Sequence, residues 1–156
     1  MKTLILYATK HGATAEIARR IAEQINDTVI HDLKQGDAPS IDGFDCVIIG
    51  SAIYAGTIRK EAKKFLNQNA DVLCGKKLGL FISGMEASGK EKYFEANVPA
   101  SIRQAATIAS VLGGEFDPKK AGFFERLIMR LVTKQSGYIS TIDDDKIKQF
   151  AEAIKT

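Results

Sequence analysis

The residues Leu4-Ile5-Leu6-Tyr7-Ala8-Thr9-Lys10-His11-Gly12-Ala13-Thr14 decide the fold of this chain. An unbroken apolar run, residues 3–8, is expected where both faces of a parallel strand are covered. The segment from Thr14 to Asn26 has apolar residues at helical spacing, and Thr14 is its predicted N-cap. In a turn between a strand and a helix, free N–H groups and the helix dipole attract anions, and glycine allows close backbone approach. We therefore predict that the loop Thr9–Thr14 binds a phosphate.

Length and composition are those of a soluble globular protein. The 156 residues fit a single domain, 1–156, and 45% of them are hydrophobic while 26% are charged. No apolar run approaches the length of a membrane span, and Met1 leads directly into the first strand pattern, so we expect no signal peptide. Cys46 and Cys74 form neither a metal-ligand cluster nor a disulfide framework, so we predict no metal site. We expect a reduced, cytoplasmic protein.

Strand and helix patterns alternate along the whole chain. The pattern predicts strands at 3–8, 28–33, 46–49, 77–83 and 107–112. It predicts helices at 14–26, 58–69, from near Pro99, at 123–134 and at 143–155, with loops at 51–57 and 85–97. Five strands that alternate with helices indicate an α/β fold with a doubly wound parallel sheet.

Three loops at the ends of predicted strands are rich in small residues: Thr9–Thr14, Ser51–Thr57 and Ser83–Glu86. In an open parallel sheet, ligands bind beyond the carboxyl ends of the strands, where the strand order reverses. We therefore expect these three loops to converge on one ligand.

The first loop separates three classes of nucleotide and phosphate site. A dinucleotide fold requires G-x-G-x-x-G after the first strand, and only Gly12 is present. A phospho-acceptor receiver requires an aspartate after the third strand, where this chain has Gly50-Ser51. A P-loop requires Gly-Lys-Ser/Thr, which is absent at the required spacing. A mononucleotide with a flat ring remains.

Thr9-Lys10-His11-Gly12-Ala13-Thr14 resembles the T-x-x-G-x-T phosphate loop of flavodoxins, which bind FMN. The resemblance covers nearly the whole chain and implies a flavodoxin-like, three-layer αβα fold with strand order 2-1-3-4-5. It places around the FMN phosphate Thr9, Lys10, His11, Gly12, Ala13 and Thr14. It places against the flavin ring Ser51, Ala52, Ile53, Tyr54, Ala55 and Gly56, and at its other edge Ser83, Gly84, Met85 and Glu86.

A closer likeness is to the flavodoxin-like, menaquinone-dependent protoporphyrinogen oxidases. It rests on residues 1–6, on 48–53 and on the segment Phe124–Leu131. This resemblance implies an FMN-dependent oxidoreductase of haem biosynthesis that oxidises protoporphyrinogen IX and passes electrons to a quinone. It also implies a basic helical insertion, here at about 117–137. This chain is shorter than the family pattern, its 85–97 loop is less basic, and no catalytic residue on the substrate side is identifiable.

Two residues are candidates for tuning the flavin. Tyr54 is the aromatic residue best placed to stack on the isoalloxazine, with Ile53 as the alternative contact. Gly56 tolerates a peptide flip that other residues resist, so a carbonyl near Tyr54–Gly56 is a candidate acceptor for flavin N5–H. Lys10 either assists the phosphate or faces solvent, and His11 is expected to offer its backbone N–H with the imidazole outward.

The segment Phe123–Lys134 is amphipathic and basic. It either packs on the sheet or lies at the surface of an anionic membrane, where a quinone dissolves. The net charge of +3 includes five positive residues between Lys119 and Lys134 against Glu125 alone. The predicted partners are a tetrapyrrole, a quinone or a redox protein, without nucleic acid.

Two rival functions remain open from the sequence. A flavodoxin-type one-electron carrier has no small-molecule substrate, but such carriers tend to be acidic, whereas this chain is mildly basic. An FMN-dependent quinone reductase would take its electrons from a nicotinamide.

Overall fold

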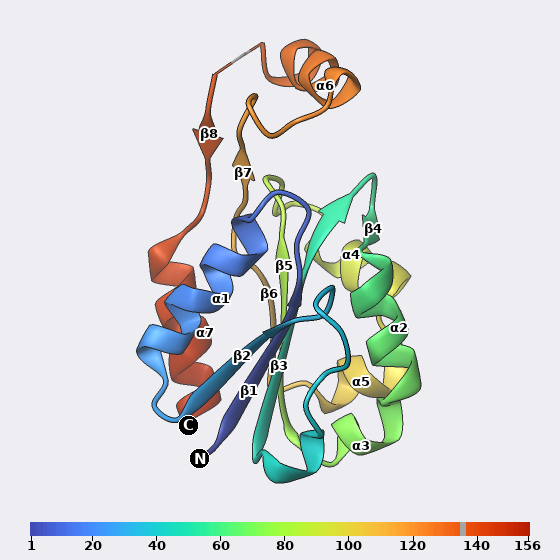
Figure 1. Ribbon diagram of the computed structural model, residues 1–156, viewed down its shortest axis with the longest axis vertical. Helices are drawn as coiled ribbons and strands as arrows, with labels where there is room; N and C mark the ends of the chain where they lie inside the picture. Colours follow the sequence, from blue (N-terminus) through green and yellow to red (C-terminus); the bar gives the residue numbers. More distant parts are fainter. Residues whose placement is uncertain (135–136) are drawn as a thin grey trace.

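The computed structural model describes residues 1–134 and 137–156 and is built on one twisted sheet (Figure 1). Five parallel strands follow the order β2-β1-β3-β5-β6, and the short β4 pairs antiparallel with β3. When β4 is set aside, this is the predicted order 2-1-3-4-5, so the flavodoxin-like prediction is confirmed. The bounds are β1 Thr3–Ala8, β2 Thr28–Asp32, β3 Cys46–Tyr54, β4 Thr57–Ile58, β5 Lys77–Ser83 and β6 Ile108–Val111.

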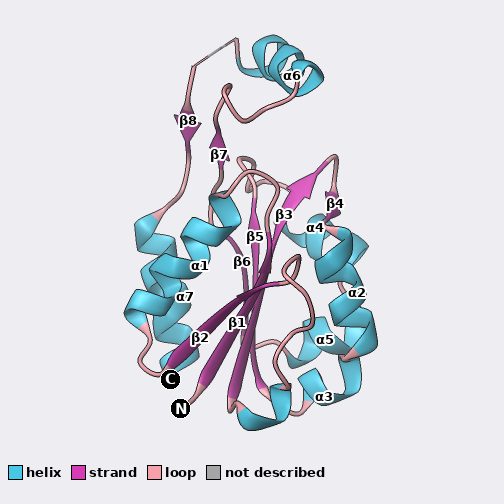
Figure 2. Cartoon of the chain, in the orientation of Figure 1, coloured by secondary structure: helices cyan, strands magenta, loops and turns pink. Residues whose placement is uncertain are grey.

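Helices cover both faces of the sheet and make three layers (Figure 2). On one face lie α1 (Ala13–Gln24) and α7 (Asp144–Lys155); on the other lie α2 (Lys60–Gln68), α3 (Ala70–Cys74), α4 (Lys90–Asn97) and α5 (Ala100–Ala105). Because side chains alternate along a strand, Leu4 and Leu6 enter the α2–α5 core while Ile5 enters the α1–α7 core. Both faces are therefore buried, which explains the unbroken apolar run. Cys46 is buried in the second core, as expected.

The third strand continues beyond its predicted end. We expected it to stop at Gly50-Ser51 and a loop to follow at 51–57, but β3 runs to Tyr54. Its last residues pair with β4, Ile53 opposite Ile58 and Tyr54 opposite Thr57. Ala55 and Gly56 form the two-residue turn, both at positive φ (48° and 77°), the geometry that suits a tight hairpin. The predicted loop is therefore a hairpin.

Three smaller predictions were also wrong. The N-cap of α1 is Gly12, and Thr14 lies inside the first helical turn. The predicted loop 85–97 contains α4, whose irregular apolar pattern hid its helical period. The helix predicted at 58–69 begins at Lys60, because residues 57–58 belong to β4.

The segment between β6 and α7 forms a two-stranded arm with a helix at its end. Strand β7 (Glu115–Phe116) pairs antiparallel with β8 (Ile139–Ser140), and between them α6 (Phe123–Thr133) lies beyond the carboxyl end of the sheet (Figure 1). None of its described residues is buried, so packing of this helix on the sheet is excluded. The predicted insertion at about 117–137 falls in this segment, apart from residues 135–136, which lie outside the described residues. Within 1–134 and 137–156, no helix combines the length and apolar content that a membrane span requires.

Candidate functional site

The carboxyl ends of β1, β3 and β5 open into a cleft of about 470 Å³. That volume lies in the usual range for small-molecule and cofactor sites. All of the residues predicted for the site line this cleft except Gly12 and Ser51. The three loops therefore converge, as their positions at the strand ends led us to expect.

The loop Thr9–Thr14 has the free donors that an anion requires. Gly12 adopts φ 105°, and its N–H donates to Thr9 Oγ1 at 2.9 Å. The first hydrogen bond of the helix joins Glu16 N–H to the Gly12 carbonyl at 3.0 Å, so the N–H groups of residues 13–15 have no acceptor within the helix. No side chain caps this end of the helix. Thr14 is fully buried, and its Oγ1 has no hydrogen-bond partner among the described residues. A buried hydroxyl without a partner at a helix N-terminus fits an anionic ligand that supplies the missing bonds.

Two side chains of this loop reach the helix above it. Lys10 Nζ forms an ion pair with the Glu125 carboxylate and lies 4.5 Å from the centre of the Tyr54 ring. His11 Nε2 lies 2.9 Å from Glu125 Oε2. The imidazole therefore contacts α6 instead of pointing outward as we expected. Lys10 is held against α6 as well, so a lysine that only faces solvent is excluded.

The protonation of His11 follows from its surroundings. Burial lowers its pKa, and the neighbouring cations Lys10, Lys120, Arg59 and Lys34 lower it further. The Glu125 carboxylate acts in the opposite direction, but it shares its charge with Lys10. The lowered pKa favours the neutral ring at pH 7, and a hydrogen bond to the Glu125 carboxylate requires the proton of that ring on Nε2. Such a concentration of positive charge suits a phosphate.

The β3–β4 hairpin is fixed by two polar side chains behind it. Ser51 is buried, and its hydroxyl accepts from Arg59 N–H at 2.9 Å and donates to the Ala52 carbonyl at 2.8 Å. Asn97, buried at the end of α4, donates to the Gly56 carbonyl at 2.8 Å and accepts from Ile58 N–H at 3.1 Å. Ser51 thus supports the hairpin from behind the cleft. Asn97 was not predicted, because nothing local in the sequence links it to a turn far away along the chain.

The segment Ser83–Glu86 forms the opposite edge of the cleft. Gly84 N–H donates to the Gly113 carbonyl at 3.0 Å, and the Gly84 backbone packs closely against Gly114. A Cβ on Gly84 would lie 2.7 Å from Ile53 Cγ2, so only glycine brings this edge so near the hairpin.

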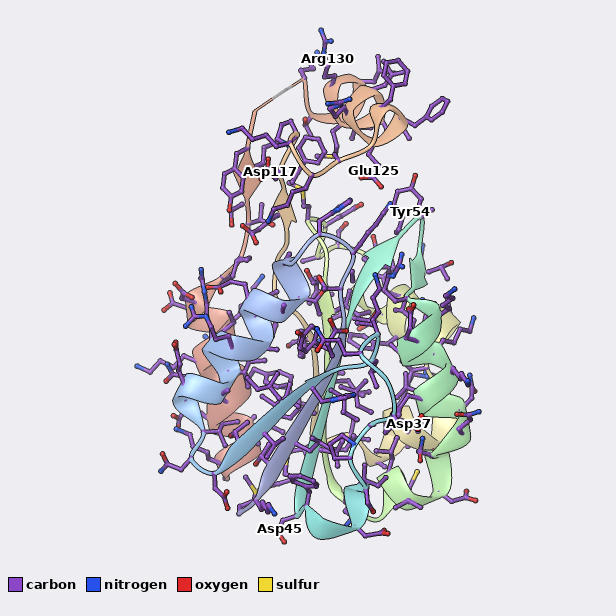
Figure 3. The ribbon with its side chains drawn as sticks, viewed as in Figure 1. Asp37, Asp45, Tyr54, Asp117, Glu125 and Arg130 are labelled. Atoms are coloured by element: carbon purple, nitrogen blue, oxygen red, sulfur yellow. The ribbon has the colours of Figure 1, made fainter. Side chains whose placement is uncertain are left out.

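Helix α6 and its arm add a wall that the sequence did not predict as part of the site. The additional lining residues are Arg59, Tyr93, Gly114, Glu115, Phe116, Glu125, Ile128, Met129 and Val132. Tyr54, which is 51% exposed, lies at the mouth of the cleft, and Glu125 faces it from α6 (Figure 3). Arg130 points away from the sheet (Figure 3). Among the described residues, no group of three His, Cys, Asp or Glu side chains is arranged to hold a metal.

Known proteins resemble the chain along most of its length. Protoporphyrinogen IX dehydrogenase [quinone] of Escherichia coli is 23% identical over 147 residues, covering 88% of this chain and 81% of that protein. A flavodoxin of Streptococcus pneumoniae superimposes with a TM-score of 0.62 at 18% identity, covering 99% of this chain and 98% of that one. A flavoprotein of Lactobacillus acidophilus in complex with FMN superimposes with a TM-score of 0.55 at 18% identity, covering 70% and 91%.

The family follows from the sequence itself. A family model described as a flavodoxin domain matches residues 4–143. This range includes β1 from Leu4, the other four parallel strands, the three loops of the cleft and the whole β7–β8 arm. The chain therefore belongs to the flavodoxin family.

Proposed function

We propose that this protein is an FMN-dependent oxidoreductase of the protoporphyrinogen IX dehydrogenase type, with a quinone as electron acceptor. The observation that carries the proposal is α6, which turns one side toward the cleft and exposes apolar side chains on the other. A carrier that only exchanges electrons with another protein needs an accessible flavin edge, whereas a helix over the cleft suits a substrate that must be enclosed. The relative that is 23% identical over most of both chains supports the same type of reaction.

FMN is the cofactor of the family, and the residues of the cleft fit it. The amides that open α1, with the Thr9 and Thr14 hydroxyls, would hold the phosphate. The hairpin residues Ile53–Gly56 would bound one side of the flavin ring and Met85 the other. Bound FMN supplies reversible uptake of electrons, and the protein supplies orientation and electrostatics. The wall made by α6 would exclude water from this side of the ring.

A second hollow suits the acidic groups of a tetrapyrrole. Phe116, Phe123, Arg126, Leu127 and Arg130 surround a space of about 340 Å³ next to the cleft, and Phe116 lines both. Neither guanidinium is paired with a carboxylate among the described residues. Apolar rings beside two free arginines match a substrate that carries propionates on a large apolar framework.

The exposed side of α6 supports peripheral contact with an anionic membrane, where a quinone dissolves. Phe123 and Phe124 are 68% and 74% exposed, and Leu131 and Val132 are 74% and 75% exposed. Arg126, Arg130 and Lys134 lie along the same helix. An apolar stripe with flanking cations is typical of helices that lie in a membrane interface.

Vesicle co-sedimentation tests the membrane contact. We expect binding to vesicles that contain anionic lipid, and we expect Phe124→Asp to abolish it. Val72→Asp is the matched control, because Val72 is an exposed apolar residue on α3, far from α6. Equal binding of both variants and the wild type would contradict the contact.

Anaerobic stopped-flow reduction of the FMN-loaded protein tests the reaction. We expect protoporphyrinogen IX to bleach the visible flavin absorbance and a quinone to restore it. Reduction by NADPH in place of the tetrapyrrole would identify a quinone reductase. Reduction only by a redox protein would identify an electron carrier, and either result would refute the proposal.

A further inference from the structure

Helix α6 is tied to the phosphate loop by charged contacts that come from one short segment. Glu125, in the first turn of α6, accepts from Lys10 Nζ and from His11 Nε2. Lys120, just before the helix, donates from Nζ to the His11 carbonyl at 3.3 Å. The side chain of Glu125 is only 17% exposed, although α6 has no fully buried residue. These are therefore the main polar contacts that attach α6, which has little apolar packing, to the phosphate loop.

The same side chains, the Lys10 ammonium and the His11 ring N–H, are those that a phosphate would use. Lys10 and His11 belong to the loop in which the Thr14 hydroxyl has no hydrogen-bond partner among the described residues. Lys120 and Arg59 lie near enough to lower the pKa of His11. A phosphate monoester brings up to two negative charges to this loop, where Glu125 already holds one. Like charges in a half-buried site repel each other, and each weakens the hold of the other on a shared cation.

We propose that Glu125 is an internal competitor of the FMN phosphate: its carboxylate latches α6 to Lys10 and His11, and the arriving phosphate releases that latch. The inference rests on the proposed binding of FMN in this cleft. It adds that cofactor loading replaces the contacts of Glu125 with contacts to the phosphate, so that the first turn of α6 is bound to the loop more tightly when the site is empty, while the β7–β8 arm keeps α6 beside the cleft in both states.

Flavin titrations with the variant Glu125→Gln test the competition. The amide keeps the size of the side chain and removes its charge. We expect the Kd for FMN to fall about tenfold, while the Kd for riboflavin, which lacks the phosphate, stays unchanged. Glu152→Gln is the matched control, because it makes the same charge change at the far end of α7. An FMN-to-riboflavin affinity ratio equal to that of the wild type would overturn the proposal.

Hydrogen exchange of α6 tests the release without relying on a flavin. We expect inorganic phosphate to accelerate amide exchange across residues 123–133 of the wild type, relative to chloride at the same ionic strength. In Glu125→Gln, exchange should be fast already and should not respond to phosphate. Exchange that phosphate leaves unchanged in the wild type would also overturn the latch. If the wild type binds neither flavin, the FMN proposal fails. The hydrogen-exchange experiment with inorganic phosphate then still decides the role of Glu125.

Discussion

At the scale of single residues, the site is defined by polar groups whose partners are missing or shared. Thr14 Oγ1 is buried without a partner, and Lys10 and His11 share one carboxylate. Natural proteins rarely leave buried hydroxyl groups unsatisfied, and such groups concentrate where a ligand binds. Each of these residues therefore gives a specific expectation for the binding of a phosphate.

Replacing Thr14 with valine removes the hydroxyl and keeps the shape. Because that hydroxyl gains no hydrogen bond in the protein alone, we expect the free energy of unfolding to stay constant or to rise by about 1 kcal/mol. We expect the Kd for FMN to rise about tenfold, since the phosphate loses one donor. Urea denaturation and flavin fluorescence titration measure the two effects.

Thr3→Val is the control for that substitution. Thr3 is equally buried but lies at the amino end of β1, away from the cleft. It should leave FMN binding unchanged. Wild-type affinity in Thr14→Val would show that the hydroxyl does not contact the phosphate.

His11 should make both stability and FMN binding depend on pH. Its folded pKa lies below the ordinary 6.5, so its neutral form stabilises the protein above that value, and the stability is lost as the pH falls toward the folded pKa. A bound phosphate favours the imidazolium and raises the pKa, so FMN affinity should increase as the pH falls through the same range. NMR titration of the ring protons, assigned with His31→Gln, measures the pKa. A value above 6.5 without FMN would contradict this expectation.

The residues of the phosphate loop were predictable because their motif is local. A glycine and two threonines between an apolar strand and a helix carry their meaning within a few positions. Glu125 and Asn97 were not predictable, because each acts on a loop distant in sequence and looks like an ordinary helical residue there. Only the folded chain brings these pairs together.

At the scale of elements, the β3–β4 hairpin and α6 determine the shape of the cleft. The hairpin was expected as a loop because its small residues, Gly50 to Gly56, weaken the strand pattern. The amphipathic pattern of α6 was recognised correctly, but periodicity alone does not say what a helix faces. The β7–β8 arm determines that α6 faces the cleft. Its strands have two residues each, which is too short to be recognised in the sequence.

Asn97→Ala should loosen the hairpin. The substitution leaves Ile58 N–H and the Gly56 carbonyl without the partners that Asn97 provides. We expect a loss of about 2 kcal/mol in the free energy of unfolding and weaker binding of both FMN and riboflavin. Denaturant unfolding and flavin titration are the measurements.

Asn67→Ala is the matched control for the hairpin. Asn67 is an exposed helical asparagine that donates to the carbonyl four residues before it, as Asn97 also does. It should change stability by less than about 0.5 kcal/mol. If the two variants behave alike, Asn97 does not support the hairpin.

At the scale of the whole molecule, the parallel sheet gathers all three loops at one end, while both termini lie at the other (Figure 1). This arrangement was predictable, because alternating strand and helix patterns leave few topologies for a chain of this length. We propose that the whole chain unfolds as one domain, with α1 and α7 joined by the ion pair of Arg20 with Asp144 at 2.8 Å.

Acid should weaken the ion pairs within α1. Hydrogen bonds from Arg19 and then Arg20 lower the pKa of Glu16 from 4.5 to about 2. A lowered carboxyl pKa stabilises the folded state above 4.5, and that contribution is lost as the pH falls from 4.5 to about 2. We expect one cooperative urea transition, whose midpoint falls over this range more steeply in the wild type than in Glu16→Gln. Parallel pH profiles would contradict the role of Glu16.

We propose that the three loops form an FMN site whose phosphate end is the loop Thr9–Thr14. The most direct measurement is a fluorescence titration of FMN with the purified protein, beside riboflavin and beside Thr14→Val. We expect fluorescence quenching that saturates at one FMN per chain, weaker binding of riboflavin than of FMN, and loss of that preference in Thr14→Val. Absence of FMN binding, or equal affinity of the wild type for FMN and riboflavin, would contradict it.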